Sequence, residues 1–159
     1  MMRSVRGFTL IELMVTIGIM AIIAVIAVPS FTNMLLRQNL NASTRSLVIT
    51  LEKARSKAAL ERRAVTVTLN SSAADTDSTL NWVASGKSVL ISTTTSITFR
   101  PDGMVQDPTT TAAPLTNPDM TLVLCDQAQA QAQYSKRIIL SRMGTVQQGE
   151  LVSGSCNAS

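Results

Sequence analysis

Residues 7–28 read GFTLIELMVTIGIMAIIAVIAV, and this stretch decides how the rest of the chain is interpreted. The 21 residues from Phe8 to Val28 are enough to cross a bilayer, which takes about 20 apolar residues in a helix. Glu12 is the one ionisable residue among them. A charge inside an apolar span costs about 2.5 kcal/mol or more and is expected to have a partner. The stretch therefore predicts a membrane helix with a functional carboxylate.

Two simpler interpretations compete for the same stretch. A secretory signal peptide would need a small-residue cleavage site after the apolar run, and Ala27-Val28-Pro29-Ser30 is a poor one because of its proline. An ordinary membrane anchor would not need Glu12. Arg3 and Arg6 precede the run, so the positive-inside rule places the N-terminus in the cytoplasm and the rest of the chain outside.

The segment Gly7-Phe8-Thr9-Leu10-Ile11-Glu12 resembles the prepilin peptidase signature of type IV pilins and type II secretion pseudopilins. The resemblance implies cleavage between Gly7 and Phe8, N-methylation of the new amine of Phe8, and pairing of Glu12 with the Phe8 amine of a neighbouring subunit. An ammonium and a carboxylate in a low-dielectric bundle are each costly alone and far less costly together. The pair can therefore set the axial register of assembly.

A second, amphipathic helical segment follows Pro29, a residue that is expected to bend or loosen the helix. Apolar residues recur at spacings of three and four up to about Arg62. The expected organisation is a leader peptide at 1–7, a transmembrane and assembly helix at 8–29, an amphipathic helix at 30–63 and a β-rich globular part at 64–159.

Alternating apolar and polar residues after the helix predict strands. Short strands joined by short turns favour antiparallel sheet, so the expected fold class is α+β, a long N-terminal helix packed on antiparallel β-sheet as in pilins. Residues 107–118 are expected to form an exposed loop, and residues 127–133 either a loop or one helical turn. The expected strands are 64–69, 80–84, 88–92, 96–99, 121–124, 136–140 and 145–152.

A narrower resemblance rests on residues 51–58, on 62–67 and on Phe99-Arg100-Pro101-Asp102-Gly103, which are similar to the GspH, FimT and FimU group of minor pilins and pseudopilins. It implies a minor pilin that helps prime assembly of a type IV pilus and sits in its tip complex. The alternative is a type II secretion pseudopilin. Implied partners are other minor and major pilins, the prepilin peptidase and the inner-membrane assembly platform. The implied location is the bacterial inner membrane, with a periplasmic globular part, and then the pilus.

Cys125 and Cys156 are the two cysteines, and they follow the segment that directs export. An even number of cysteines in an oxidising compartment predicts a disulfide, and minor pilins of this group commonly have one near the C-terminus. Two buried free thiols are the alternative.

The composition argues against an enzyme. The chain has no histidine, the commonest general base and metal ligand, and two cysteines cannot complete a four-ligand zinc site. No constellation of nucleophile and base is recognisable, so no cofactor, metal or catalytic residue is expected.

DNA uptake is a further alternative, because some FimT-like pilins bind DNA through a C-terminal Gly-Arg-x-Arg motif. The matching place here reads Gly144-Thr145-Val146-Gln147 and lacks both arginines. Lys136, Arg137 and Arg142 lie nearby and leave weak contact with DNA phosphates open. The net charge of +4 falls to +2 without Arg3 and Arg6 (12 − 10), too small a surplus to favour nucleic acid by itself.

Overall fold

A computed structural model describes residues 8–92, 94–107, 119–154 and 156. The chain divides into two compact units, Met1–Leu35 and Leu36–Ser159. The expected leader peptide at 1–7 and most of the expected loop at 107–118 lie outside the described residues.

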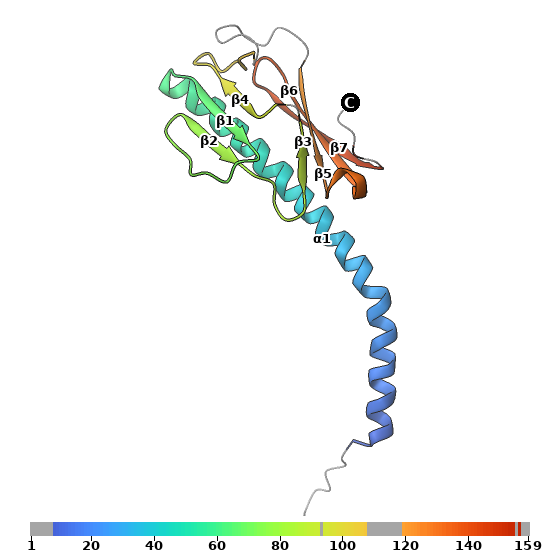
Figure 1. Ribbon diagram of the computed structural model, residues 1–159. Coiled ribbons are helices and arrows are strands. Elements are labelled where there is room, and N and C mark those ends of the chain that lie inside the picture. The colour runs from blue at the N-terminus through green and yellow to red at the C-terminus, as the bar shows by residue number, and fades with distance from the viewer. Residues whose placement is uncertain (1–7, 93, 108–118, 155, 157–159) are drawn as a thin grey trace, which may run out of the picture. The chain divides into compact units, whose positions relative to one another are not determined.

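A single helix, α1, spans Leu10–Glu61 and contains Pro29 in its interior (Figure 1). The predicted helix from Phe8 to about Arg62 is therefore confirmed to within two residues at each end. The helix ends at Glu61 because Arg62 takes a left-handed conformation, with φ of 51°. The amide of Arg63 then donates to the carbonyl of Ala58 over 3.3 Å, which closes the last turn.

Within the second unit, α1 buries one face and exposes the other, as amphipathic spacing requires. Leucines and a valine supply most of the buried volume, and Ala54 and Ala58 are fully buried where the helix lies close to the strands. The buried residues are Leu36, Leu40, Ser43, Thr44, Leu47, Val48, Leu51, Ala54 and Ala58.

The described residues of this unit form seven strands in two sheets (Figure 1). The three-stranded sheet has the order β2-β1-β4, and the four-stranded sheet has the order β3-β5-β6-β7. Each strand overlaps one of the predicted segments, and residues 129–131 form the short 3₁₀ helix η1 where a loop or one helical turn was expected. The strands are β1 (Val65–Leu69), β2 (Thr79–Trp82), β3 (Val89–Ile91), β4 (Ser96–Phe99), β5 (Met120–Cys125), β6 (Tyr134–Leu140) and β7 (Val146–Ser153).

The predicted fold of a long N-terminal helix packed on antiparallel sheet is confirmed, and one pair of strands departs from the antiparallel arrangement. β1 and β2 run parallel, with Val67 opposite Leu80. Residues 70–78 bring the chain back so that β2 starts beside the beginning of β1, and the turn out of β1 begins at Asn70, whose φ is 55°. The other named pairs are antiparallel.

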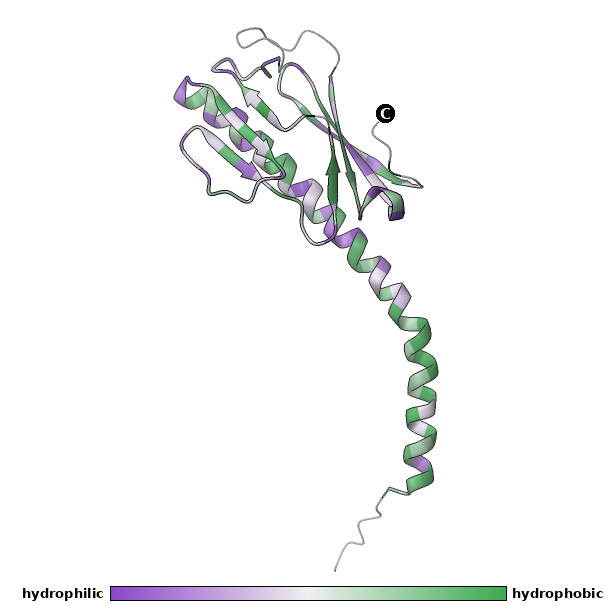
Figure 2. Cartoon of the chain, viewed as in Figure 1, coloured by the Kyte–Doolittle hydropathy of each residue, from purple (hydrophilic) through white to green (hydrophobic). Residues whose placement is uncertain are grey.

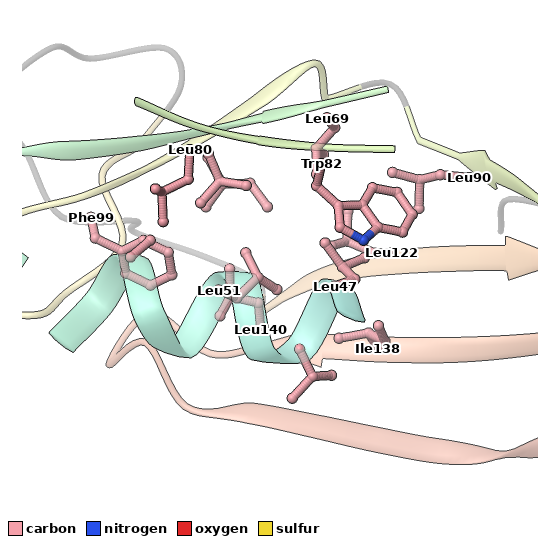
Figure 3. Packing of buried hydrophobic residues seen from close by; sticks show 14 of the residues in the cluster. Leu47, Leu51, Leu69, Leu80, Trp82, Leu90, Phe99, Leu122, Ile138 and Leu140 are labelled. Carbon is pink, nitrogen blue, oxygen red and sulfur yellow. The ribbon is translucent and has the colours of Figure 1, made fainter. Parts of the chain in front are cut away.

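The hydrophobic core lies between α1 and both sheets. Figure 3 shows Leu47 and Leu51 of α1 among side chains that come from strands of each sheet, including Trp82 of β2 and Leu122 of β5. Polar contacts fix the helix within this core: the indole Nε1 of Trp82 donates to Ser46 Oγ at 2.8 Å.

Candidate functional site

The first unit contains the part of α1 that the sequence identifies as a membrane span. It is the one helix in the described ranges that is long and apolar enough to cross a bilayer, and none of its most apolar window is buried inside the protein. Figure 2 shows hydrophobic residues around this part of α1, whereas hydrophilic residues are interspersed along the part that belongs to the second unit. A helix that is apolar on all sides and uncovered by its own chain is suited to a membrane or to other such helices.

Glu12 lies in the first turn of α1 and forms a capping box with Thr9, the residue before the helix. Glu12 Oε2 accepts hydrogen bonds from the backbone amide of Thr9 at 3.3 Å and from its hydroxyl at 3.2 Å. In return, the backbone amide of Glu12 donates to Thr9 Oγ1 at 3.3 Å. The reciprocal bonds satisfy amides that the first turn of a helix leaves unpaired.

No role was predicted for Thr9, although the pattern Thr-x-x-Glu before an apolar run is the signal for a capping box. The capping box fixes the position of the Glu12 carboxylate. It is held against Thr9 at the amino end of the helix, where the partial positive charge of the helix dipole favours an anion.

Pro29 lies inside α1 and cannot donate a hydrogen bond to the carbonyl of Val25, four residues before it. Nearby, Thr32 Oγ1 donates to the carbonyl of Val28 at 3.0 Å. Helical geometry nevertheless continues through the proline. Gly7, on the other side of the predicted cleavage point from Phe8, lies outside the described residues.

Cys125 and Cys156 form a disulfide in the structure, with their Cα atoms 5.9 Å apart. The bridge is buried with Val123, on the opposite face of β5 from Leu122 and Leu124, which belong to the main core. Next to it, the buried Asp126 accepts a hydrogen bond from the amide of Gln133 at 3.1 Å. The disulfide thus ties the C-terminal segment to the end of β5.

The three cations considered for DNA contact do not form one cluster on a strand face. Lys136 and Arg137 are consecutive in β6, so their side chains point to opposite faces of the sheet. Arg142 lies beyond the end of β6, and its carbonyl accepts a hydrogen bond from the amide of Val105 at 2.9 Å.

Gly144, the first position of the DNA-binding pattern, has a structural reason to be glycine. Its φ is +76°, and a Cβ there would lie 2.4 Å from the carbonyl oxygen of Gly103 and 2.9 Å from Arg55 Nε. The turn that contains Gly144 therefore packs against the turn that contains Gly103, with the Arg55 side chain beside both. A glycine at this place requires no DNA to explain it.

The described ranges contain no group of three or more cysteine, aspartate or glutamate residues that could hold a metal ion.

Comparison with known proteins gives two family matches and one structural likeness. The prokaryotic N-terminal methylation motif matches residues 2–28, and the type II transport protein GspH family matches residues 43–144, more than half of the chain. A crystal structure of the type IV minor pilin FimU from Pseudomonas aeruginosa aligns with 72% of this chain and 90% of its own, at 15% identity and a TM-score of 0.49. No curated protein matches significantly.

The two family matches cover most of the N-terminal helix and most of the globular unit. The methylation motif covers the capping box and the apolar part of α1, and the GspH match covers α1 from Ser43 to its end and strands β1 to β6. The apolar helix and the motif indicate anchoring in a membrane, with the globular unit outside the cytoplasm. The chain carries the prokaryotic N-terminal methylation motif and belongs to the type II transport protein GspH family, as a type IV pilin-like protein.

Proposed function

We propose that this chain is a minor pilin of a type IV pilus, a structural subunit that helps prime assembly and sits in the tip complex. One observation supports a role as a filament subunit more than any other. The apolar part of α1 is uncovered by the rest of the chain, and its single carboxylate, Glu12, is held by Thr9, the residue that follows Phe8. Such a helix has its natural partners in other helices of the same kind.

Processing would precede assembly. The prepilin peptidase would cleave between Gly7 and Phe8 and leave Phe8 with a free amine, which is then methylated. This cut removes Arg3 and Arg6, the cations that hold the N-terminus at the cytoplasmic face. The cleaved helix would stay in the inner membrane until it enters the filament through the assembly platform, with the globular part in the periplasm.

Assembly would use the Glu12 carboxylate. Both hydrogen bonds from Thr9 go to Oε2, so Oε1 has no partner among the described residues. Oε1 can therefore accept a hydrogen bond from the amine of a neighbouring Phe8. The pair forms between subunits that are displaced along the helix axis, because Glu12 lies four residues beyond Phe8. Pro29 would let the amphipathic segment at 30–63 change direction after the membrane segment at 8–29.

A pseudopilin of a type II secretion system is the second candidate, and the match to the GspH family favours it. Both candidates are filament subunits with the same helix chemistry, so the globular unit must distinguish them through its partners. We assign the chain no enzymatic activity, because pilins and pseudopilins are structural subunits.

The experiment is deletion of the gene in its host, with complementation by the wild-type chain. The proposal expects loss of surface pili, restored by complementation, with unchanged secretion of folded proteins through the outer membrane. Normal pili together with a secretion defect would favour the pseudopilin. Uptake of DNA should be scored in the same strains, since loss of uptake with normal pilus numbers would point to the DNA receptor instead.

A further inference from the structure

Exposed apolar residues on α1 continue beyond the predicted membrane span and end just before Arg37. The large side chains of Phe31, Met34 and Leu35 are all exposed. Arg37 is the first charged residue after the apolar run and lies nine residues beyond Val28, about 13.5 Å along a helix. The headgroup layer of a bilayer extends about 5 to 8 Å beyond the apolar core, and helical side chains lean toward the N-terminus. Because the exposed apolar residues run to Leu35, Arg37 is within reach of lipid headgroups.

The Arg37 side chain is oriented by Tyr134, the only tyrosine of the chain, at the start of β6. Its guanidinium lies 4.1 Å from the centroid of the Tyr134 ring, and its Nη2 donates a hydrogen bond to the Tyr134 hydroxyl. A guanidinium has five N–H donors, and within the described part of the chain this is the one bond that Arg37 donates from them. A planar guanidinium that is oriented in this way and keeps free donors can bind a phosphate through two parallel hydrogen bonds.

A second cation, Lys87, lies at the same end of the second unit. It belongs to the turn between β2 and β3, which packs on α1 two residues beyond Arg37, since a Cβ at Gly86 would overlap the side chain of Asn39. Tyr134 and this turn therefore both adjoin the part of α1 that enters the unit (Figure 1). Lys87 is exposed, and it has no ion-pair partner in the described ranges.

This end of the unit presents little negative charge. The turn at 83–88 has Lys87 as its one charged residue, and the connection from β5 to β6 has Asp126. Asp126 is fully buried. Along α1, no acidic residue occurs between Glu12 and Glu52. The exposed charges of these segments are therefore cations.

We propose that Arg37 and Lys87, with Arg37 oriented by Tyr134, bind the phosphate groups of anionic phospholipids in the membrane that anchors the chain. We call these three residues the basic rim. A lipid headgroup is favoured over a free anion because the apolar part of α1 brings the rim to the membrane surface. The inference goes beyond the proposed function, since it needs only membrane anchoring and holds for a pilin and a pseudopilin alike. Its consequence is that the globular unit rests on the membrane until assembly draws it away.

Hydrogen exchange of the full-length chain in lipid nanodiscs tests the proposal. One set of discs contains phosphatidylcholine alone, and the other contains phosphatidylcholine mixed equally with phosphatidylglycerol, an anionic lipid. Exchange of the amides at 85–88 and 127–134 should be about fivefold slower or more in the anionic discs, because each cation near an anionic surface favours the bound state about fivefold. Exchange at 101–104, in the turn that lies beside Arg55 much farther along α1, should be equal in the two lipids.

Single substitutions assign the effect to the basic rim. Arg37→Gln and Lys87→Gln should each reduce the slowing in anionic discs about fivefold. Arg37→Gln also removes the contact with Tyr134, which changes exchange in both lipids, so only the difference between the lipids is compared. Lys87→Gln leaves the contacts of the fold unchanged. Arg45→Gln is the matched control, because Arg45 is eight residues, about 12 Å, farther along α1, beyond the range of a surface potential at physiological salt, and it should keep the lipid effect.

Three results would overturn the inference. Equal exchange of the wild-type chain in the two kinds of disc would mean that the basic rim does not bind anionic lipid. Loss of the lipid effect in Arg45→Gln as large as in Arg37→Gln would mean a general attraction of a cationic chain. Slowing by inorganic phosphate alone in phosphatidylcholine discs would mean a site for a free anion instead of a headgroup. The gene deletion described above tests the proposed function separately.

Discussion

Glu12 Oε2 accepts hydrogen bonds from both the backbone amide and the hydroxyl of Thr9, at 3.3 and 3.2 Å. The carboxylate on which the assembly argument rests is therefore already engaged within its own subunit. Two roles of Glu12 follow, as a cap for the first turn of α1 and as the proposed counter-charge for a neighbouring amine. Substitutions can separate these roles, because the cap needs only a hydrogen-bond acceptor and the ion pair needs a negative charge.

Thr9→Val should weaken the cap without changing the charge of Glu12. The variant loses the hydroxyl that both donates to Glu12 and accepts from its amide, at a cost of about 1 kcal/mol for the first turn. Faster hydrogen exchange at the amide of Glu12, measured on the full chain in detergent micelles, is the expected result. Thr9→Ser, which keeps the hydroxyl, should exchange like the wild type, and equal exchange in all three proteins would rule out the cap.

The disulfide should contribute strongly to the stability of the second unit. It closes a loop with a sequence separation of 31, for which chain entropy predicts about 3 to 4 kcal/mol. Replacing both cysteines by alanine should lower the midpoint of urea unfolding of the full chain in detergent. Reduction of the wild-type protein should lower it by a similar amount, and an unchanged midpoint in both cases would show that the bridge adds little.

Gly144→Ala should destabilise the second unit through backbone strain and through a steric clash. Gly154→Ala, which adds strain without a clash, separates the two effects. Both glycines have positive φ, +76° and +128°, but a Cβ at Gly144 meets the Gly103 carbonyl and one at Gly154 meets nothing within 4 Å. Backbone strain alone costs about 1 to 2 kcal/mol, so Gly144→Ala should cost more than Gly154→Ala. Equal losses in thermal unfolding would mean that the contact between the two turns is relaxed in solution.

DNA binding by this chain should be no tighter than non-specific. The pattern at Gly144 lacks both arginines, and β6 places Lys136 and Arg137 on opposite faces. Titration of the detergent-solubilised chain with duplex DNA should give a dissociation constant of about 10⁻⁶ M or larger at physiological salt. The affinity should fall steeply as the salt concentration rises. Tight binding under those conditions would restore the DNA receptor as a candidate.

Much of the fold could be predicted from sequence because hydrophobic periodicity reports which side of an element is buried. Alternation in Val65-Thr66-Val67-Thr68-Leu69 identified β1, and spacings of three and four identified the helix. The same periodicity does not say which strand lies beside which. The parallel pairing of β1 with β2 and the division of the strands into two sheets depend on the path of the chain between the strands. The alternation of apolar and polar residues within a strand gives no information about that path.

In the candidate site, too, some residues could be predicted from the sequence and others could not. Glu12 was identifiable because a charge in an apolar run is costly, and Thr9 was identifiable in principle from the capping-box pattern. Contacts between distant residues had no such signal. The Arg37 guanidinium lies 4.1 Å from the centroid of the Tyr134 ring, and nothing in either sequence neighbourhood indicates that these two residues meet.

The pairing of Glu12 with the Phe8 amine of a neighbouring subunit is the central claim, and Glu12→Gln tests it most directly. The amide can still accept from Thr9, so the cap persists, but the negative charge is gone. Glu12→Ala, which removes both, is the matched comparison. Cleavage after Gly7 should continue in both variants, because the junction and the apolar run are unchanged. Anchoring should persist, since each variant removes a charge from the span.

The measurement is the amount of processed Glu12→Gln protein recovered in sheared surface filaments, relative to wild type, in a strain that lacks the native chain. An unpaired ammonium buried in the bundle costs several kcal/mol, so we predict that Glu12→Gln is processed normally but recovered as poorly as Glu12→Ala. Recovery of Glu12→Gln at the wild-type level, with normal pilus numbers, would contradict the charge pair and leave the cap as the role of this residue.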